Sequence, residues 1–188
     1  MHLRAMWLLA ALIAVPGIVQ AQDNTRFSVG GQFTVVHLHW VDEFPGGFGG
    51  RFSYDAIQRG SFVLAPEAEV NYFPQNRFGR FGETELLAGV RAGVRLGQFG
   101  FFAKARPGLV HFTGKFVEDL HGSPSTNFAF DAGGVFEYTT LRRLTFRIDM
   151  GDTMMYAPEP FIRGLPAGSG PTGNFHNFQA NFGVGFRF

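Results

Sequence analysis

The sequence predicts an all-β fold, an eight-stranded antiparallel up-and-down transmembrane β-barrel with short turns at one end and longer loops at the other. Three observations support this fold. Segments of about ten residues alternate apolar and polar residues with a period of two, as two-faced strands do. Their number is even, and short and long connections alternate between them. The ionised residues inside these segments fall on the face opposite the apolar one.

The expected strands follow one another along the whole chain after its first 25 residues. They are 26–38, 48–56, 61–73, 85–96, 101–109, 127–138, 144–151 and 177–188. Tight turns are expected at 57–60, 97–100 and 139–143, and long loops at 39–47, 74–83, 113–126 and 156–174. Pro66 has no N–H for a ladder hydrogen bond and predicts a bulge, and Pro107 marks a second irregular place.

The last expected strand shows the pattern most clearly. Its apolar face carries Phe178, Ala180, Phe182, Val184, Phe186 and Phe188, and its other face carries Asn177, Gln179, Asn181, Gly183, Gly185 and Arg187. A soluble protein rarely leaves so aromatic a strand open to edge pairing. In a barrel that spans a bilayer, the apolar face contacts lipid, the polar face lines the lumen, and no edge remains.

The first residues predict export from the cytoplasm. Arg4 precedes an apolar run from residue 5 to residue 15, and small residues end the segment at Ala21. This is the pattern of a signal peptide, and the run is shorter than the roughly 20 apolar residues of a membrane-spanning helix. We expect two parts, a signal peptide at 1–21 and a barrel domain at 22–188.

Composition agrees with a barrel and excludes several other classes. The chain has 24 Phe and 26 Gly but only 16% charged residues. It has no cysteine, so neither a disulfide nor a lipid-modified N-terminal cysteine is possible. The formal net charge of +1 gives no reason to expect nucleic acid as a partner. A soluble β-sandwich remains the alternative fold on composition alone.

Charged residues distinguish a lumen from a soluble core. Within the expected strands, eight cations and seven anions share the face opposite the apolar one. An outward Arg or Lys near mid-bilayer would cost about 2 to 4 kcal/mol, whereas opposite charges in a narrow interior can satisfy one another. A sandwich would have to bury these ions in an apolar core. We therefore expect a lumen filled by charged side chains, since eight strands enclose little more space than side chains occupy.

Fourteen of these residues form the expected lumen charge network. They are Arg51, Asp55, Glu67, Glu69, Glu85, Arg91, Arg95, Lys104, Arg106, Asp131, Glu137, Arg147, Asp149 and Arg187. Arg26 falls on the same face at the start of the first strand. Asp152 lies near a strand end, and it is the one strand-end acid whose face the pattern leaves open.

These features resemble one known family. The signal peptide, the two-faced strands, the loop asymmetry and the ending Val184-Gly185-Phe186-Arg187-Phe188 are similar to the small outer-membrane β-barrels of double-membraned bacteria. That family includes the barrel domain of outer membrane protein A and the Ail/OmpX-type barrels. The resemblance covers essentially the whole mature chain, but this sequence has no peptidoglycan-binding domain after the last strand.

The resemblance implies a location and several partners. It places the chain in the bacterial outer membrane, in contact with outer-membrane lipid and lipopolysaccharide. It also implies that the insertion machinery recognises the final apolar face as an assembly signal. The residues of that expected signal are Phe182, Val184, Phe186 and Phe188.

Histidines near the long-loop end raise the possibility of an enzyme, because several barrels modify lipid A. His37, His39, His111, His121 and His176 are all expected there, where they can also act as polar-tipped interfacial aromatics beside Trp40 and Tyr72. His176 lacks the neighbouring serine of a lipid A deacylase. His37 and His39 with Asp42 or Glu43 offer metal-ligand types without a closed set of spacings. We therefore expect no enzyme, no catalytic residue, no cofactor and no metal.

Two function classes remain open from the sequence. The first is a structural or interaction barrel that displays the loops 113–126 and 156–174 for adhesion or for binding an extracellular ligand. The second is a small pore for ions or solutes. The charge-balanced lumen favours the first class, because porins keep a water-filled channel and usually have many more strands.

Overall fold

The computed structural model describes residues 25–38, 44–74, 82–113, 125–140, 143–157 and 173–188, so the expected signal peptide lies outside the described residues. These ranges contain nine strands: β1 Phe27–Leu38, β2 Gly46–Tyr54, β3 Ile57–Arg59, β4 Phe62–Phe73, β5 Gly82–Leu96, β6 Phe99–Thr113, β7 Ser125–Thr139, β8 Leu144–Ala157 and β9 Gly173–Arg187. None of the ranges holds a helix with the length and hydropathy needed to cross a membrane.

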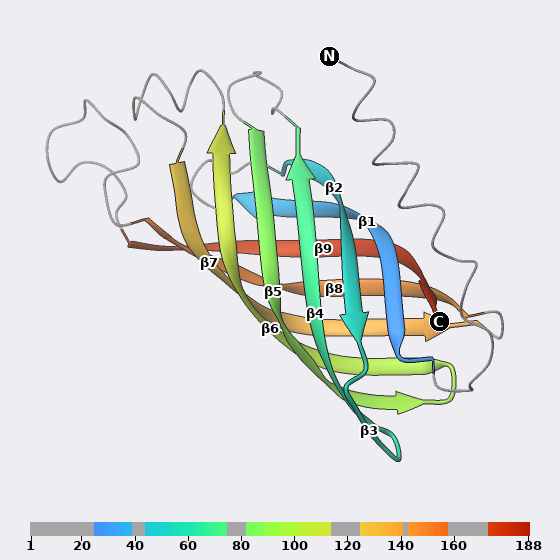
Figure 1. The fold of residues 1–188 in the computed structure, drawn as a ribbon. Coiled ribbons are helices and arrows are strands. Elements are labelled where there is room, and N and C mark those ends of the chain that lie inside the picture. The colour runs from blue at the N-terminus through green and yellow to red at the C-terminus, as the bar shows by residue number, and fades with distance from the viewer. Residues whose placement is uncertain (1–24, 39–43, 75–81, 114–124, 141–142, 158–172) are drawn as a thin grey trace, which may run out of the picture.

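The strands form one closed antiparallel sheet (Figure 1). Its order is β2-β1-β9-β8-β7-β6-β5-β4-β3, and a β2–β4 pairing completes the circle. Because β2 and β3 both pair with β4, they are one interrupted strand, and the barrel has eight strands around its circumference. The predicted fold class is confirmed.

The interruption between β2 and β3 is a β-bulge. β2 pairs with β4 as far as Ser53, and β3 resumes that pairing at Ile57 with its register shifted by one residue. The β4–β5 ladder runs without a break through Pro66, which pairs with Val90. The bulge predicted at Pro66 therefore lies in the strand opposite it. Pro107 falls in a gap of the β5–β6 ladder, and the register is the same on both sides of that gap.

The turns between hairpin strands are shorter than predicted. The expected turn 57–60 is mostly strand β3, and the chain reverses at residues 60–61. The expected turn 97–100 reverses at residues 97–98 alone. Gly60 and Gly97 open these two turns with φ of 59° and 60°, which matches a type II′ hairpin turn. Only glycine adopts this conformation without strain, so both turns depend on it.

Strands also extend further toward the long-loop end than the alternation predicted. β5 begins at Gly82, β6 continues to Thr113, and β9 begins at Gly173, all within expected loops. Gly46 and Gly47, expected in a loop, belong to β2. Pairing with a neighbouring strand extends regular structure through residues whose side chains do not alternate. The middle of each expected long loop lies outside the described residues.

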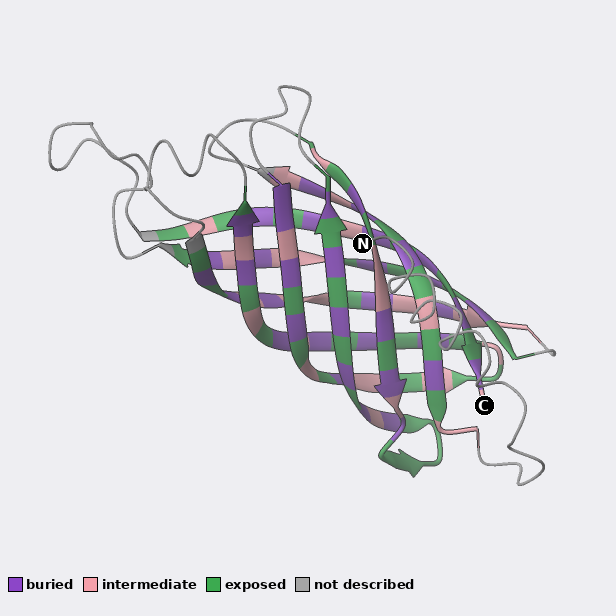
Figure 2. Cartoon of the chain, turned by 45° about the horizontal axis from the view of Figure 1, so that its top comes forward, coloured by how far each residue is buried: buried purple, intermediate pink, exposed green. Residues whose placement is uncertain are grey.

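The two faces of the sheet differ as predicted. Buried and exposed residues alternate along the strands in Figure 2. The outer face is apolar, with Phe33, Phe101 and Phe182 each about half exposed. Among the Asp, Glu, Lys and Arg side chains of the nine strands, only Arg59 and Asp152 face outward. The barrel thus reverses the usual arrangement of a soluble protein, in which apolar residues fill the interior.

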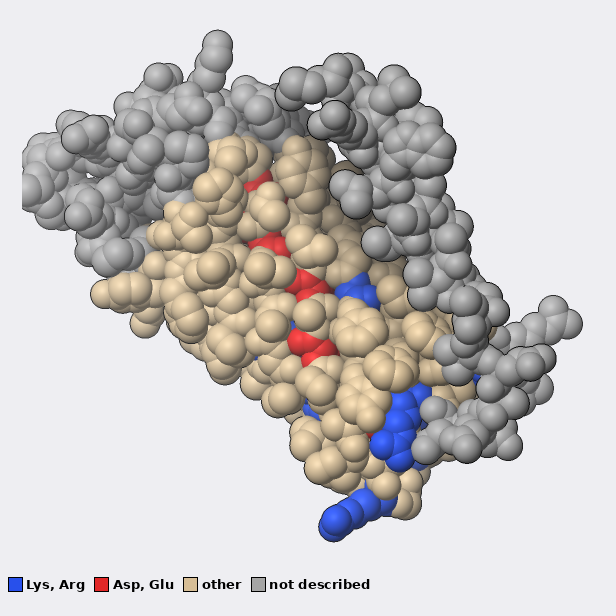
Figure 3. Space-filling model, in the orientation of Figure 1, with Lys and Arg blue, Asp and Glu red and all other residues tan. Residues whose placement is uncertain are grey.

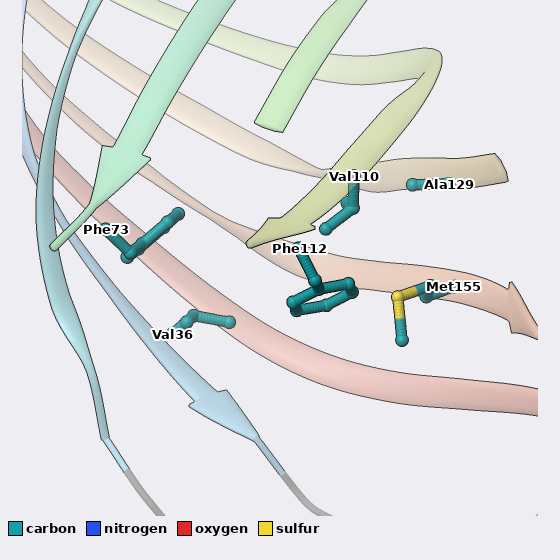
Figure 4. Packing of buried hydrophobic residues seen from close by; sticks show 6 residues of the cluster. All are labelled: Val36, Phe73, Val110, Phe112, Ala129 and Met155. Atoms are coloured by element: carbon teal, nitrogen blue, oxygen red, sulfur yellow. The ribbon is translucent and has the colours of Figure 1, made fainter. Parts of the chain in front are cut away.

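Apolar side chains nevertheless occupy both ends of the interior. A loop-end cluster joins β1, β4, β6, β7 and β8, and its side chains point toward one another in Figure 4; it consists of Val36, Phe73, Val110, Phe112, Ala129 and Met155. A turn-end cluster consists of Val63, Ala65, Phe102 and Val135. The sequence predicts that charged side chains fill the lumen, whereas these two clusters place apolar side chains in it as well.

Candidate functional site

The centre of the barrel contains an ion pair that joins opposite sides of its circumference. Glu67 is on β4 and Arg147 is on β8, and three strands separate them in either direction around the barrel. Arg147 donates from Nη1 to Glu67 Oε2 at 2.8 Å and from Nη2 to Glu67 Oε1 at 3.0 Å. Neither side chain is exposed to solvent. The two parallel bonds fix the planar guanidinium against the planar carboxylate.

Arg106 and Lys104, both on β6, extend this contact through the middle of the lumen. Arg106 contacts Asp131 at 2.7 Å, Glu69 at 2.5 Å and Glu67 at 3.0 Å. Lys104 contacts Asp131 at 3.0 Å and also Asp149. Each cation therefore meets more than one carboxylate, which is the condition under which buried charges are tolerated.

Toward the short turns, three arginines gather around one carboxylate, and one of them, Arg91, is also 3.6 Å from Glu67 of the central group. Asp55 accepts a contact from Arg187 at 2.5 Å, from Arg95 at 2.8 Å and from Arg91 at 3.3 Å. Arg91 also pairs with Glu137, which lies 3.5 Å from Arg95. Every second residue of β2 points inward. Asp55 reaches this position because it continues that alternation directly after the strand ends at Tyr54.

Toward the long loops, side-chain amides take the place of the cations as hydrogen-bond donors to a carboxylate. Glu85 Oε2 accepts hydrogen bonds from Asn71 Nδ2 at 2.8 Å and from Gln179 Nε2 at 3.1 Å. Gln179 is on β9 and Glu85 is on β5, so this contact also spans the barrel between opposite strands. Arg51 donates to Gln32 Oε1 at 3.0 Å on the adjacent strand. The interior is therefore crossed by side chains at two levels.

All fourteen residues of the expected lumen charge network lie on the inner face. Thirteen are buried, and Arg95 has 16% of its side chain exposed at the turn end. The sequence analysis missed Glu83, which it assigned to a loop although it is buried in β5. Its position two residues before Glu85 gives it the same face, and that spacing was the available signal. It also did not identify Asn71 as a central donor.

Histidines on the described strands lie close to the long-loop end. His176 Nδ1 is 2.5 Å from Asp152 Oδ2, and both side chains are largely exposed on the outer face. His111 Nδ1 is 2.8 Å from Thr126 Oγ1, and the His37 ring stacks on Phe44 at 4.3 Å. Asp152 is thus an outward residue with a histidine partner.

Five residues that the sequence analysis named at this rim fall in the connections between strands. His39, His121, Trp40, Asp42 and Glu43 lie outside the described residues. Within the part that is described, no group of three His, Cys, Asp or Glu side chains is arranged to hold a metal ion.

The fold has counterparts among solved structures. No protein-family model matches the chain, and no curated protein matches it. Neisserial surface protein A superposes with a TM-score of 0.53 at 14% identity, over 86% of this chain and 97% of that one. A major outer membrane protein from Thermus thermophilus gives 0.53 at 9% identity, over 86% and 99% of the two chains. The chain has the fold of small outer-membrane barrels, as the sequence predicted.

Proposed function

We propose that the chain is an integral barrel of the bacterial outer membrane with a closed lumen, and that it serves as a structural or interaction protein through its long loops. The apolar outer face supports the membrane location. Side chains such as Phe33, Leu86 and Phe128 are about half exposed there, and a continuous apolar band of this kind would promote aggregation in water. In lipid the same band is stable, and the closed ladder leaves no unpaired edge.

The contact between Arg147 and Glu67 carries the proposal of a closed lumen. It joins strands on opposite sides of the barrel, and Gln179 and Glu85 make a second such contact nearer the loops. The loop-end and turn-end clusters lie beyond these contacts in either direction. A porin, in contrast, keeps an open aqueous channel and builds it from more strands.

The interaction role falls to the long connections, because loops on a rigid barrel commonly carry binding function. The segments proposed for adhesion or for binding an extracellular ligand are 113–126 and 156–174. Their central residues, 114–124 and 158–172, lie outside the described residues. β6 and β7 support the first segment, and β8 and β9 support the second. We propose no catalytic role.

The final strand supports a proposed role in assembly. Phe182, Val184 and Phe186 are each nearly half exposed on the outer face of β9, and Phe188 is less exposed. This aromatic face is available to lipid once the barrel has formed and to the insertion machinery before that. The outer-membrane lipids and this machinery are therefore the partners that the proposal assigns to the barrel itself.

Conductance measurements test the closed lumen. The protein, refolded in detergent and added to a planar lipid bilayer, is expected to give no steady current, because charged and amide side chains cross its interior. Stable and reproducible open steps at constant voltage would overturn the proposal and favour a pore for ions or small solutes. A known porin added to the same bilayer serves as the positive control.

A further inference from the structure

A cavity of about 450 Å³ opens at the end of the barrel that carries the short turns. Thr25 and Arg187, near the two ends of the described chain, lie on one side of it. The short connections that contain Gly60, Gly97 and Thr140 complete the lining. Its lining includes Arg95, Arg143, Arg187, Gln58, Gln98 and Thr140. Val63 of the turn-end cluster also lines it, so the cavity ends at packed side chains.

The ionised residues that line this cavity are all arginines. Asp55 contacts Arg95, Arg187 and Arg91. The other nearby acid, Glu137, pairs with Arg91 and lies 3.5 Å from Arg95. Arg143 is exposed and makes no ion pair with a described residue. The local charge is therefore positive, although the whole chain carries only +1. Figure 3 shows Lys and Arg residues on the surface near this end.

Neutral hydrogen-bonding groups accompany this charge in the lining. Arg95 has 16% of its side chain exposed, although its Nη2 is buried and lies 3.5 Å from Glu137 Oε2. Gln98 and Thr140 add an amide and a hydroxyl group to the lining. Guanidinium forks together with neutral donors match the oxygens of a phosphate group, and the volume is within the range of small-molecule sites.

We propose that this cavity binds a small, soluble, phosphate-bearing molecule. This inference goes beyond the proposed function. Only one part of it rests on that function, namely that the cavity faces the periplasm. The cavity lies at the mouth of the barrel among the turns, whereas lipid contacts the outer face. A free phosphate compound therefore reaches the arginines more directly than a lipid headgroup does.

Binding of sodium pyrophosphate to the refolded protein tests the site. Isothermal titration calorimetry in a zwitterionic detergent at low salt is expected to detect binding to the wild type. Arg143→Gln is expected to weaken binding about tenfold, as loss of a charge-assisted hydrogen bond does. Arg59→Gln is the matched control, because Arg59 is exposed at the same end but does not line the cavity. Equal loss in both variants, or no binding to the wild type, would overturn the proposal.

A second variant tests the cavity without changing an arginine. Gln98→Glu places a carboxylate in the lining and is expected to abolish pyrophosphate binding, while the backbone bond from Thr139 N to Gln98 O is kept. Undiminished binding would contradict the assigned position. In a further arm, phosphatidylglycerol is added to the micelles. Competition with pyrophosphate that requires Arg143 would assign the site to a lipid headgroup and overturn the soluble ligand, whereas unchanged binding supports it.

Discussion

Arg147 and Glu67 form a two-bond ion pair between opposite strands of the barrel, with donor–acceptor distances of 2.8 and 3.0 Å. Neither side chain is exposed to water, so each charge depends on its partners for stabilisation. Breaking such a pair by removing one member leaves an uncompensated charge in the interior. The stability of the barrel therefore depends on this pair of charged side chains in its lumen.

Removal of Arg147 should destabilise the folded barrel strongly. We expect Arg147→Met to lower the free energy of unfolding by about 3 to 5 kcal/mol, because Glu67 would lose its bidentate partner and keep only Arg106 and the more distant Arg91. Urea unfolding in detergent, followed by circular dichroism, measures the change. Arg59→Met, on the exposed strand β3, should have little effect.

The double variant Arg147→Met with Glu67→Leu separates pairing from general disruption. If the two residues act as a pair, the double variant should lose less stability than the two single changes together. Strictly additive losses would mean that the contact itself contributes nothing.

A second prediction concerns the close approach of β5 and β6 at Gly93. A Cβ atom at this position would lie 2.0 Å from the carbonyl oxygen of Phe101 and 2.6 Å from the Cα of Phe102. These are backbone atoms, so the ladder itself would have to move. We expect Gly93→Ala to cost about 1 to 3 kcal/mol in unfolding free energy, in the range of overpacked sites.

Gly134 provides the matched control for that substitution. It also lies inside a strand, but the nearest atom to an added Cβ is 4.0 Å away. Gly134→Ala should therefore change the unfolding free energy much less than Gly93→Ala in the same assay. Equal losses would show that general strand effects of glycine, and not close packing, explain the result.

A third prediction tests which end of the barrel faces the cell exterior. The chain has no cysteine, so a single introduced thiol is a specific label. We expect a membrane-impermeant maleimide to label Ser169→Cys, in a long connection, on intact cells. It should label Gln98→Cys, in a short turn, only after the outer membrane is opened. The reverse pattern would contradict the proposed orientation.

A fourth prediction separates two roles of Phe188. Its ring stacks on Phe27 at 6.0 Å, and the two residues exchange backbone hydrogen bonds of 3.0 Å. Phe188→Ala should keep these backbone bonds and lose about 1 to 2 kcal/mol of apolar burial, which leaves refolding in detergent nearly intact. If the ring belongs to an assembly signal, the amount inserted in cells should fall sharply. Heat-dependent mobility on a denaturing gel measures both.

Phe178→Ala is the control for the assembly prediction. Phe178 is on the same face of β9, is 54% exposed and lies outside the expected signal. It should therefore change insertion in cells no more than it changes refolding. Similar losses of insertion for both variants would show that the assay reports outer-face aromatic content in general.

The alternation of residue types assigned the fourteen charged residues of the expected network to the inner face, where the structure places them. Arg106 and Asp131, for example, were assigned inward from their position relative to neighbouring apolar residues, and both are fully buried. Alternation does not determine the height of a residue within the lumen, because height depends on the register between strands. The partnership of Glu67 with Arg147, far apart in the sequence, could therefore not be derived from the pattern.

The missed features have similar causes. Glu83 was assigned to a loop because Gly82 and the residues before it do not alternate, yet β5 pairs with both neighbours at that point. The loop-end cluster was missed because Phe73 is an apolar residue on a face expected to be polar, and because Phe112 lies beyond the expected strand 101–109. The bulge was predicted from Pro66 but lies in the strand opposite it, where the pairing of β4 with β2 and β3 is interrupted; Pro66 has no N–H to donate to that ladder.

Closure of the barrel depends on a ladder between β1 and β9, in which Ser28 pairs with Arg187 and Leu38 with Asn177. These contacts join strands from opposite ends of the described chain, so they give the fold a high contact order. Closing so long a loop costs conformational entropy, and this cost must be overcome before the β1–β9 ladder stabilises the folded barrel. Until β9 pairs with β1, the partly formed sheet presents unpaired edges that can join another chain. We therefore expect closure to limit the folding rate, and a partner that holds the two edges together would accelerate it.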